Sequence, residues 1–287
     1  MAETLAAALH GVAKHYPDFT LGPLDLEIPA GSIVGLVGEN GAGKTTLLKL
    51  LTGVNPPDAG TIQLFGASPC STASRSKVGV VFEDAYFFES LTPAQVGGSL
   101  RGIFGPAWDA ARFASLLEQF HLPPQKSIKE LSRGMRMKLQ LASALAHQPE
   151  LLILDEATSG LDPAARSEVL DILLDFIQDE HHSVLLSSHI TSDLEQIADT
   201  IAYLHRGQLL FVKNKDQLME EYGILRCSRQ TLDQLPQDWI AAVHQTQTGC
   251  ESLVHPRAKV LRLLPDAVCD AANIDDIMRL MNGRDDS

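Results

Sequence analysis

The strongest constraint on this chain is a glycine-rich octapeptide that lies between an apolar run and a helical run. Residues 38–45 read GENGAGKT and match GxxxxGK[ST] at every fixed position. The preceding run, 32–37, is continuously apolar, as in a strand buried on both faces, and the following run, 46–51, reads as a helix. This order of strand, loop and helix predicts a P-loop within an α/β fold.

Each residue type in this loop has a chemical reason. Glycines let the backbone curl so that its N–H groups converge on phosphate oxygens, and the helix N-terminus adds partial positive charge. We expect Lys44 to reach the β and γ phosphates, Thr45 to place its hydroxyl on Mg²⁺, and Thr46 to start the helix beside it. The predicted phosphate-binding residues are Gly38, Glu39, Asn40, Gly41, Ala42, Gly43, Lys44, Thr45 and Thr46.

A second motif lies about 110 residues further along. The apolar run 151–154 ends in two adjacent carboxylates, Asp155 and Glu156. Consecutive side chains of a strand point to opposite faces, so the two carboxylates have different predicted roles. Asp155 suits the Mg²⁺ shell, and Glu156 suits polarising a water for attack on the γ-phosphate.

Composition and charge exclude several classes of protein. The chain has 287 residues, of which 45% are hydrophobic and 21% charged, and this balance excludes a disordered or fibrous protein. The formal charge of −13 disfavours binding to nucleic acid. The longest apolar runs fall far below a membrane span, and no secretory signal opens the sequence, so we expect a cytoplasmic protein. Four scattered cysteines predict reduced thiols with no function.

Hydrophobic periodicity divides the chain into two parts. Residues 1–215 are predicted to form a parallel-sheet core with a small antiparallel β subdomain and an inserted helical subdomain at about 90–147. Further buried strands are expected at 77–82 and 183–187, with a helix from about 164 to 179 between the last two core strands. Residues 216–287 read as an α/β accessory region that ends in an amphipathic helix over 274–281.

With these motifs the chain resembles the ATP-binding subunits of ABC transporters, over residues from about 3 to 215. The segment 131–135, LSRGM, is similar to the LSGGQ signature of that family, and 159–162, SGLD, matches its D-loop. His189 matches the switch histidine, and Tyr16 stands where the family stacks an aromatic ring on adenine. The signature and the appended region look most like those of bacterial ABC-2 type exporters.

The resemblance implies a composite site between two copies. Ser132 and Gly134 of one chain would contact the γ-phosphate held by the other, with Asp162 positioned across the interface. Glu156, His189 and Lys44 would be catalytic, with ATP as substrate and Mg²⁺ as cofactor. It also implies a homodimer or heterodimer of ATPase subunits, separate transmembrane permease subunits, no nucleic acid, and a peripheral position on the inner face of the cell membrane.

The sequence departs from the family pattern at several positions. We expect ATP hydrolysis to survive these changes, with an altered rate or altered coupling of the nucleotide site to a partner. Glu83 stands where the family usually has the Q-loop glutamine, and a carboxylate approaches Mg²⁺ but cannot donate a hydrogen bond as an amide does. Arg133 and Met135 replace the usual signature residues, and Ala157 replaces a proline. The aromatic segment 86–91 stands where the family receives the coupling helices of its membrane subunits, although core packing explains those aromatics equally well.

Two alternatives remain open from the sequence. A soluble ATPase of the same family could act in iron–sulfur assembly or translation, although a single P-loop and the appended region argue against both. A GTPase is the other class, but the segment 214–216, NKD, is one residue short of the guanine-reading NKxD spacing. The transported substrate, the direction of transport and the role of 216–287 do not follow from these residues.

Overall fold

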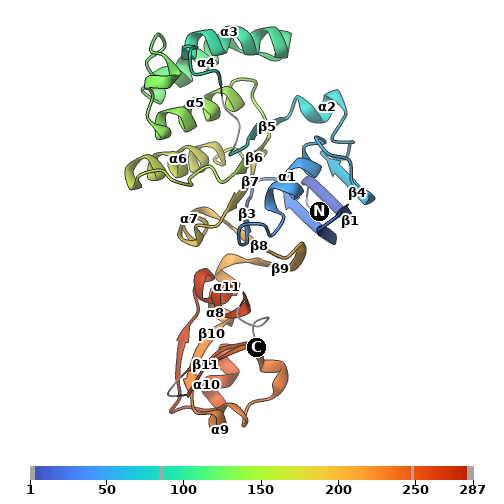
Figure 1. Cartoon of the computed structure of the whole chain (residues 1–287), viewed down its shortest axis with the longest axis vertical. Coiled ribbons are helices and arrows are strands. Elements are labelled where there is room, and N and C mark those ends of the chain that lie inside the picture. The colour runs from blue at the N-terminus through green and yellow to red at the C-terminus, as the bar shows by residue number, and fades with distance from the viewer. Residues whose placement is uncertain (1–3, 84–86, 247–248, 283–287) are drawn as a thin grey trace. The chain divides into compact units, whose positions relative to one another are not determined.

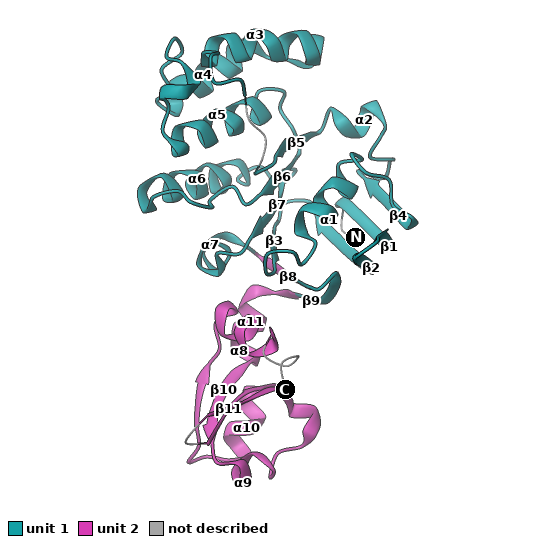
Figure 2. Cartoon of the chain, in the orientation of Figure 1, with its two compact units in different colours: residues 1–198, 202–212 teal, residues 199–201, 213–287 magenta. Residues whose placement is uncertain are grey.

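A computed structural model describes residues 4–83, 87–246 and 249–282. The chain divides into two compact units, which are coloured separately in Figure 2. Unit 1 comprises residues 1–198 and 202–212, and unit 2 comprises 199–201 and 213–287. The predicted P-loop, carboxylate pair and signature all belong to unit 1.

A six-stranded sheet forms the centre of unit 1 (Figure 1). Its strand order is β5-β6-β7-β3-β8-β9, and the pairs β5/β6, β6/β7 and β7/β3 are parallel. Every residue of β3, β6 and β7 is buried, as expected for parallel strands covered on both faces. The strands are β3 (Ile33–Val37), β5 (Val78–Val81), β6 (Leu151–Asp155), β7 (Ser183–Ser188), β8 (Thr200–His205) and β9 (Gln208–Asn214).

A second, antiparallel sheet of three strands has the order β2-β1-β4. Its strands are β1 (Leu5–Tyr16), β2 (Phe19–Pro29) and β4 (Ala59–Leu64). Helix α1 (Lys44–Leu51) contacts both β4 of this sheet and β6 of the six-stranded sheet. Its four leucines belong to one buried cluster with residues of both sheets, so α1 holds the two sheets together directly behind the P-loop.

Helices cover the rest of unit 1. The helical insertion consists of α3 (Pro93–Phe104), α4 (Ala110–Gln119) and α5 (Arg133–Leu145), and α5 packs against β5 and α6. α3 begins with a capping box between Thr92 and Gln95, and Asp109 caps α4. The other elements of this part are α2 (Thr72–Arg75), α6 (Pro163–Phe176), α7 (Thr191–Ile197) and the short 3₁₀ turns Gly105–Ala107 and Ile128–Glu130.

Unit 2 is built around an antiparallel sheet in the order β11-β12-β10-β13. Helix α11 packs against β11 and β12, α9 packs against β12, and α10 packs against β13. The elements are α8 (Lys215–Glu221), β10 (Gly223–Cys227), α9 (Arg229–Leu232), a 3₁₀ turn (Gln237–Trp239), β11 (Ile240–Thr246), β12 (Gly249–Val254), α10 (Arg257–Leu263), β13 (Val268–Ala271) and α11 (Ile274–Asn282).

The predicted fold class is confirmed, with differences at particular elements. β1, β8 and β9 were not predicted, α6 ends at Phe176 instead of near 179, and α1 begins at Lys44, so Thr46 lies inside its first turn instead of starting it. Among the described residues, no helix is long and apolar enough to cross a membrane. All four cysteines are free thiols.

Candidate nucleotide site

The P-loop connects the end of β3 to the start of α1, and two of its glycines are required by their surroundings. A Cβ on Gly38 would lie 2.3 Å from the carbonyl oxygen of Leu204. Gly43 has a φ of 108°, and a Cβ there would lie 2.7 Å from the ring of Phe19. The loop therefore follows a path that other residue types cannot adopt, and this path brings the α1 N-terminus to the centre of the site.

Lys44 is the buried cation of the site. Its side chain is only 6% exposed, and Nζ donates to the carbonyl oxygens of Gly38, at 2.7 Å, and Glu39, at 3.3 Å. Nζ also lies 3.1 Å from Oε1 of Glu156. A buried charge needs such partners, and here they hold the ammonium group against the inner side of the loop.

Asp155 and Thr45 meet where the start of α1 contacts the end of β6. The Thr45 hydroxyl donates to Oδ2 of Asp155 at 2.7 Å, and the Ser187 hydroxyl donates to Oδ1 at 2.5 Å. Asp155 ends β6, is buried, and is paired in register with Ser187 of β7. Two of the three predicted Mg²⁺ ligands, Thr45 and Asp155, are thus adjacent, and their hard oxygen atoms fit this cation.

Glu156 lies between the side chains of Lys44 and His189. Its carboxylate is 7% exposed, and Oε1 faces Lys44 while Oε2 lies 2.7 Å from Nδ1 of His189. The backbone N–H of His189 also donates to Oε2, at 3.3 Å. Glu156 has a φ of 51°, which is uncommon for a residue other than glycine and is concentrated at functional positions.

A hollow of about 230 Å³ lies in front of the P-loop. Seven residues of the P-loop and α1 line it together with Phe19, Glu83 and Glu156, so the predicted Q-loop position reaches the same space. The lining residues are Phe19, Glu39, Asn40, Gly41, Gly43, Lys44, Thr45, Thr46, Glu83 and Glu156. Phe19 was not predicted, and its only signal in the sequence is an aromatic residue three positions after Tyr16.

Tyr16 does not line this hollow. Its ring is 39% exposed and lies 6.4 Å from the ring of Phe19, centroid to centroid. Its hydroxyl accepts a hydrogen bond from Nδ2 of Asn55 at 3.3 Å. Tyr16 is therefore an exposed aromatic residue beside the hollow, and Phe19 is the aromatic residue against the loop itself.

The signature and the D-loop form a separate surface. Ser132 caps α5 by accepting from the N–H of Met135 at 3.2 Å, and Asp162 caps α6 by accepting from Ala164 and Ala165. A Cβ on Gly134 would lie 2.7 Å from Cβ of Ala165, so the first turns of α5 and α6 pack closely. Ser132, Gly134 and Asp162 do not line the hollow at the P-loop.

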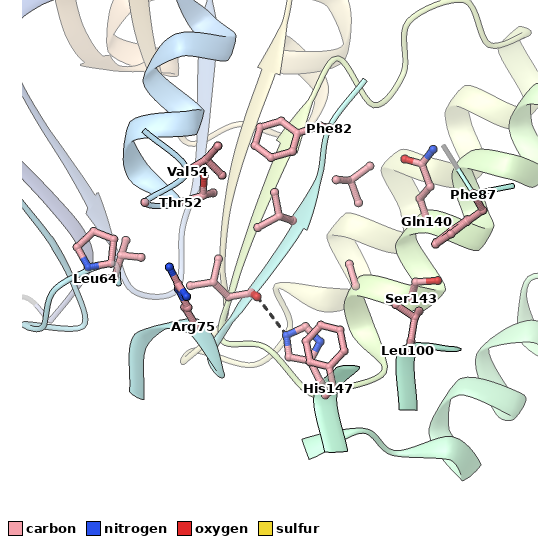
Figure 3. A pocket seen from close by; sticks show the side chains of 17 residues that line it. Thr52, Val54, Leu64, Arg75, Phe82, Phe87, Leu100, Gln140, Ser143 and His147 are labelled. Atoms are coloured by element: carbon pink, nitrogen blue, oxygen red, sulfur yellow. Dashed lines mark hydrogen bonds between the residues drawn. The ribbon is translucent and has the colours of Figure 1, made fainter. Parts of the chain in front are cut away.

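A larger hollow of about 560 Å³ lies between β5, the end of α1 and the helical insertion (Figure 3). Its lining is mostly apolar and includes Val54, Phe82, Phe87 and Leu100. At one end Nε2 of His147 lies 3.1 Å from the carbonyl oxygen of Val78. Burial lowers the pKa of His147, so this imidazole is neutral near neutral pH. Tyr86, in the aromatic segment singled out above, lies outside the described residues.

A P-loop that follows a buried parallel strand, together with a carboxylate pair at the end of a nearby strand, defines the class of P-loop ATPases. Comparison with known proteins narrows this class. The sequence pattern of the family described as ABC transporter matches residues 21–159. The bacitracin transport ATP-binding protein BcrA of Enterococcus faecalis is 36% identical, over 72% of this chain and 68% of its own length.

Two further comparisons agree. The daunorubicin resistance ATP-binding protein DrrA3 of Streptomyces coeruleorubidus is 36% identical, over 78% of this chain and 72% of its own. A solved ATP-binding subunit of an ABC transporter superimposes with a TM-score of 0.67 and 26% identity, over 75% of this chain and 92% of that chain. The chain belongs to the ABC transporter family, as one of its ATP-binding subunits. It is therefore an ATPase of a transport system, as the sequence predicted.

Proposed function

We propose that this subunit hydrolyses Mg²⁺-ATP at a site shared between two ATPase subunits and so powers the export of a drug or peptide through separate transmembrane subunits. The observation that carries the hydrolytic part is the position of Glu156. Its buried carboxylate lies between Lys44 and His189. In the sequence Glu156 directly follows Asp155, which accepts a hydrogen bond from Thr45. Base, phosphate-binding cation and candidate metal ligands thus converge beside one hollow.

The residues present fit a magnesium ion. Thr45 and Asp155 would hold it, and Glu83 lines the same hollow. A bound Mg²⁺ would neutralise charge on the phosphate oxygens. Lys44 would bind the β and γ phosphates, and Glu156 would then accept a proton from the attacking water, with His189 holding the carboxylate in place.

The proposal that two subunits share the site is supported by the positions of the signature and D-loop residues within one chain. Ser132 and Gly134 lie on the first turn of α5, and Asp162 caps α6, so all three belong to one surface. Because this surface does not line the P-loop hollow, one chain alone offers the γ-phosphate no signature contact. A two-fold pair of subunits would bring each signature onto the partner's ATP. Two identical chains or two different subunits would each make such a pair.

The proposed membrane partner would dock at the apolar hollow of Figure 3. Val54, which lines the hollow, is 61% exposed, and Phe88, which follows the lining residue Phe87, is 82% exposed. A surface of this kind suits an amphipathic helix of a permease. The export of drugs or peptides is inferred from relatives that are named for bacitracin transport and daunorubicin resistance.

The decisive experiment uses tagged Glu156→Gln. This variant should bind ATP but hydrolyse it about 10²- to 10⁴-fold more slowly, because the general base is lost. In detergent extracts of native membranes, ATP should increase the recovery of a multi-spanning membrane protein at near-equal stoichiometry. Glu150→Gln is the matched control, because Glu150 pairs with Lys77 away from the site and should leave hydrolysis unchanged. Recovery of soluble partners alone would overturn the membrane partnership.

A second experiment tests the docking surface. Val54→Glu should abolish transport while basal ATP hydrolysis continues, because the residue lines the apolar hollow and not the P-loop. Ile103→Glu is the control, since Ile103 is 76% exposed on α3 and does not line that hollow. Normal transport by a folded Val54→Glu protein would contradict the proposal, whereas loss of transport and hydrolysis together would indicate a folding defect.

A further inference from the structure

Two cysteines of unit 2 lie directly opposite each other on neighbouring antiparallel strands. The register of β10 and β12 pairs Leu225 with Ser252, Arg226 with Glu251, and Cys227 with Cys250. Directly opposed residues of antiparallel strands have Cα atoms about 4.5 or 5.5 Å apart. Both separations fall within the roughly 4.4–6.8 Å that a disulfide spans, so the backbone is already in position for a bond.

Both thiols also point to the same face of the sheet. Cys227 and Cys250 belong to the apolar cluster that includes Leu225 and Val260. The residues between them in the ladder, Arg226 and Glu251, pair with each other at 3.1 Å and do not belong to that cluster, as the alternation of strand side chains requires. Burial raises the pKa of the Cys227 thiol, and the neighbouring Cys250 raises it further, so Cys227 is mostly protonated near neutral pH and reacts slowly.

The two thiols differ in their exposure to solvent. Cys227 is half-buried, whereas Cys250 is only 6% exposed. A small oxidant would therefore reach Cys227 first, and Cys250 would be held ready behind it. Cys269 is the third cysteine of the same cluster, but the register pairs it with Leu225, two residues from Cys227. Diagonal neighbours of this kind are about 7–8 Å apart, beyond the reach of an unstrained disulfide.

We propose that Cys227 and Cys250 form a redox-active dithiol that a peroxide converts to a cross-strand disulfide. The small thiolate fraction of Cys227 attacks hydrogen peroxide, an S–O bond forms as the O–O bond breaks, and a sulfenic acid and one water result. The Cys250 sulfur then attacks the Cys227 sulfur, the S–S bond forms, and a second water leaves. Two thiols lose two electrons and two protons in total, and the peroxide gains them.

The bond would lock one part of unit 2. Residues 227 and 250 flank α9 and β11, so the disulfide closes this segment into a covalent loop and ties β10 to β12. Closing a loop lowers the entropy of the opened state, and local opening of the segment becomes rarer. We expect hydrogen exchange in β11 to slow on the order of tenfold or more after oxidation. This inference does not depend on the proposed export function.

The test oxidises the full-length Cys70→Ser variant with hydrogen peroxide, since Cys70 is exposed and would otherwise react. Peptide mapping without reduction should show one peptide pair that joins Cys227 to Cys250, with the loss of two hydrogen atoms. Adding Cys269→Ser should leave this product unchanged, whereas Cys227→Ser or Cys250→Ser should abolish it and the slowed exchange. A folded protein that yields no such pair, a bond to Cys269, or a bond between two chains would overturn the proposal.

Discussion

At the scale of single residues, the site depends on one unusual backbone conformation. A regular strand would send Asp155 and Glu156 to opposite faces of the sheet. The left-handed φ of Glu156, at 51°, ends the strand so that Asp155 meets Thr45 while Glu156 meets Lys44. The motifs predicted both carboxylates and their separate roles. The contacts of Glu156 with His189 and Lys44 join residues far apart in the chain, and no local pattern encodes such contacts.

A substitution at Gly160 tests the contact between the D-loop and Arg133, the signature residue that departs from the family pattern. Gly160 has a φ of 65°, and a Cβ there would lie 2.3 Å from a guanidinium nitrogen of Arg133. Gly160→Ala should cost about 1–2 kcal/mol of stability from the left-handed backbone and should also displace Arg133 from the surface of the D-loop. Because the displaced guanidinium adjoins Ser132 and Gly134, we also expect a several-fold lower ATPase rate.

Gly66→Ala is the matched control for that substitution. Gly66 has a φ of 74°, but a Cβ there would meet nothing within 4 Å. It should show a similar loss of thermal stability without the loss of ATPase activity. Equal ATPase rates in the two variants would show that the contact between Arg133 and Gly160 has no part in the reaction.

At the scale of elements, two adjacent glycines make α3 a sensitive measure of packing. A Cβ on Gly97 would lie 2.6 Å from the ring of Phe113 on α4, whereas Gly98 has nothing within 4 Å. Gly97→Ala should destabilise unit 1 by about 1–3 kcal/mol through overpacking. Gly98→Ala should stabilise it by up to about 1 kcal/mol, because alanine favours a helix interior. Urea unfolding followed by Trp108 fluorescence in a Trp239→Phe background would measure the free energy of unfolding of both variants. Changes of the same sign in the two variants would contradict this account of α3.

A charged cluster joins three elements of unit 2. Glu251 on β12 accepts from Arg279 of α11 at 2.9 Å and from Arg226 of β10 at 3.1 Å. The hydrogen bond from Arg279 is the main reason that the pKa of Glu251 lies below its ordinary value near 4.5. A carboxyl group with a lowered pKa in the folded state stabilises the fold above its unfolded pKa. That stability is lost as the pH falls through the folded value.

Glu251→Gln should therefore destabilise unit 2 near pH 7, and the difference should disappear as the pH falls from 4.5 through the lowered folded-state pKa. We expect on the order of 1 kcal/mol, since both arginines are about half exposed and water screens the pair. Urea unfolding followed by Trp239 fluorescence in a Trp108→Phe background gives the measurement. Glu220→Gln on the exposed side of α8 is the control and should show no such pH dependence. A constant difference between wild type and Glu251→Gln from pH 7 to pH 3 would contradict this account.

Sequence patterns predicted some elements and missed others for physical reasons. β3, β6 and β7 are continuous apolar runs because both faces of each strand are buried, and such runs are easily recognised. β1 was missed because register shifts at Leu9/Val12 and Val12/Lys14 interrupt its alternation. The strand order of unit 2 could not be predicted, since it depends on which strands pair across the sheet.

At the scale of the whole molecule, the two halves of the proposed composite site lie on different parts of unit 1. The P-loop hollow is formed by the P-loop, the first turn of α1, Phe19 of β2 and the residues that follow β5 and β6, whereas the signature surface is formed by the first turns of α5 and α6. Each chain would thus contribute one half to each of two sites. A variant that damages only one half should then be complemented by a variant that damages only the other.

Ser132→Asp and Lys44→Gln form such a pair. Aspartate still caps α5 but places a negative charge where the γ-phosphate would bind, and glutamine at position 44 still donates to the loop carbonyls but lacks the cation. Each variant alone should lose ATPase activity. An equal mixture forms half of its dimers from unlike chains, each with one intact site, so up to about a quarter of wild-type activity should return. Ser132→Asn, a neutral cap, controls for the cap itself and should stay active. A mixture no more active than its components would show that each chain hydrolyses ATP without the partner's signature.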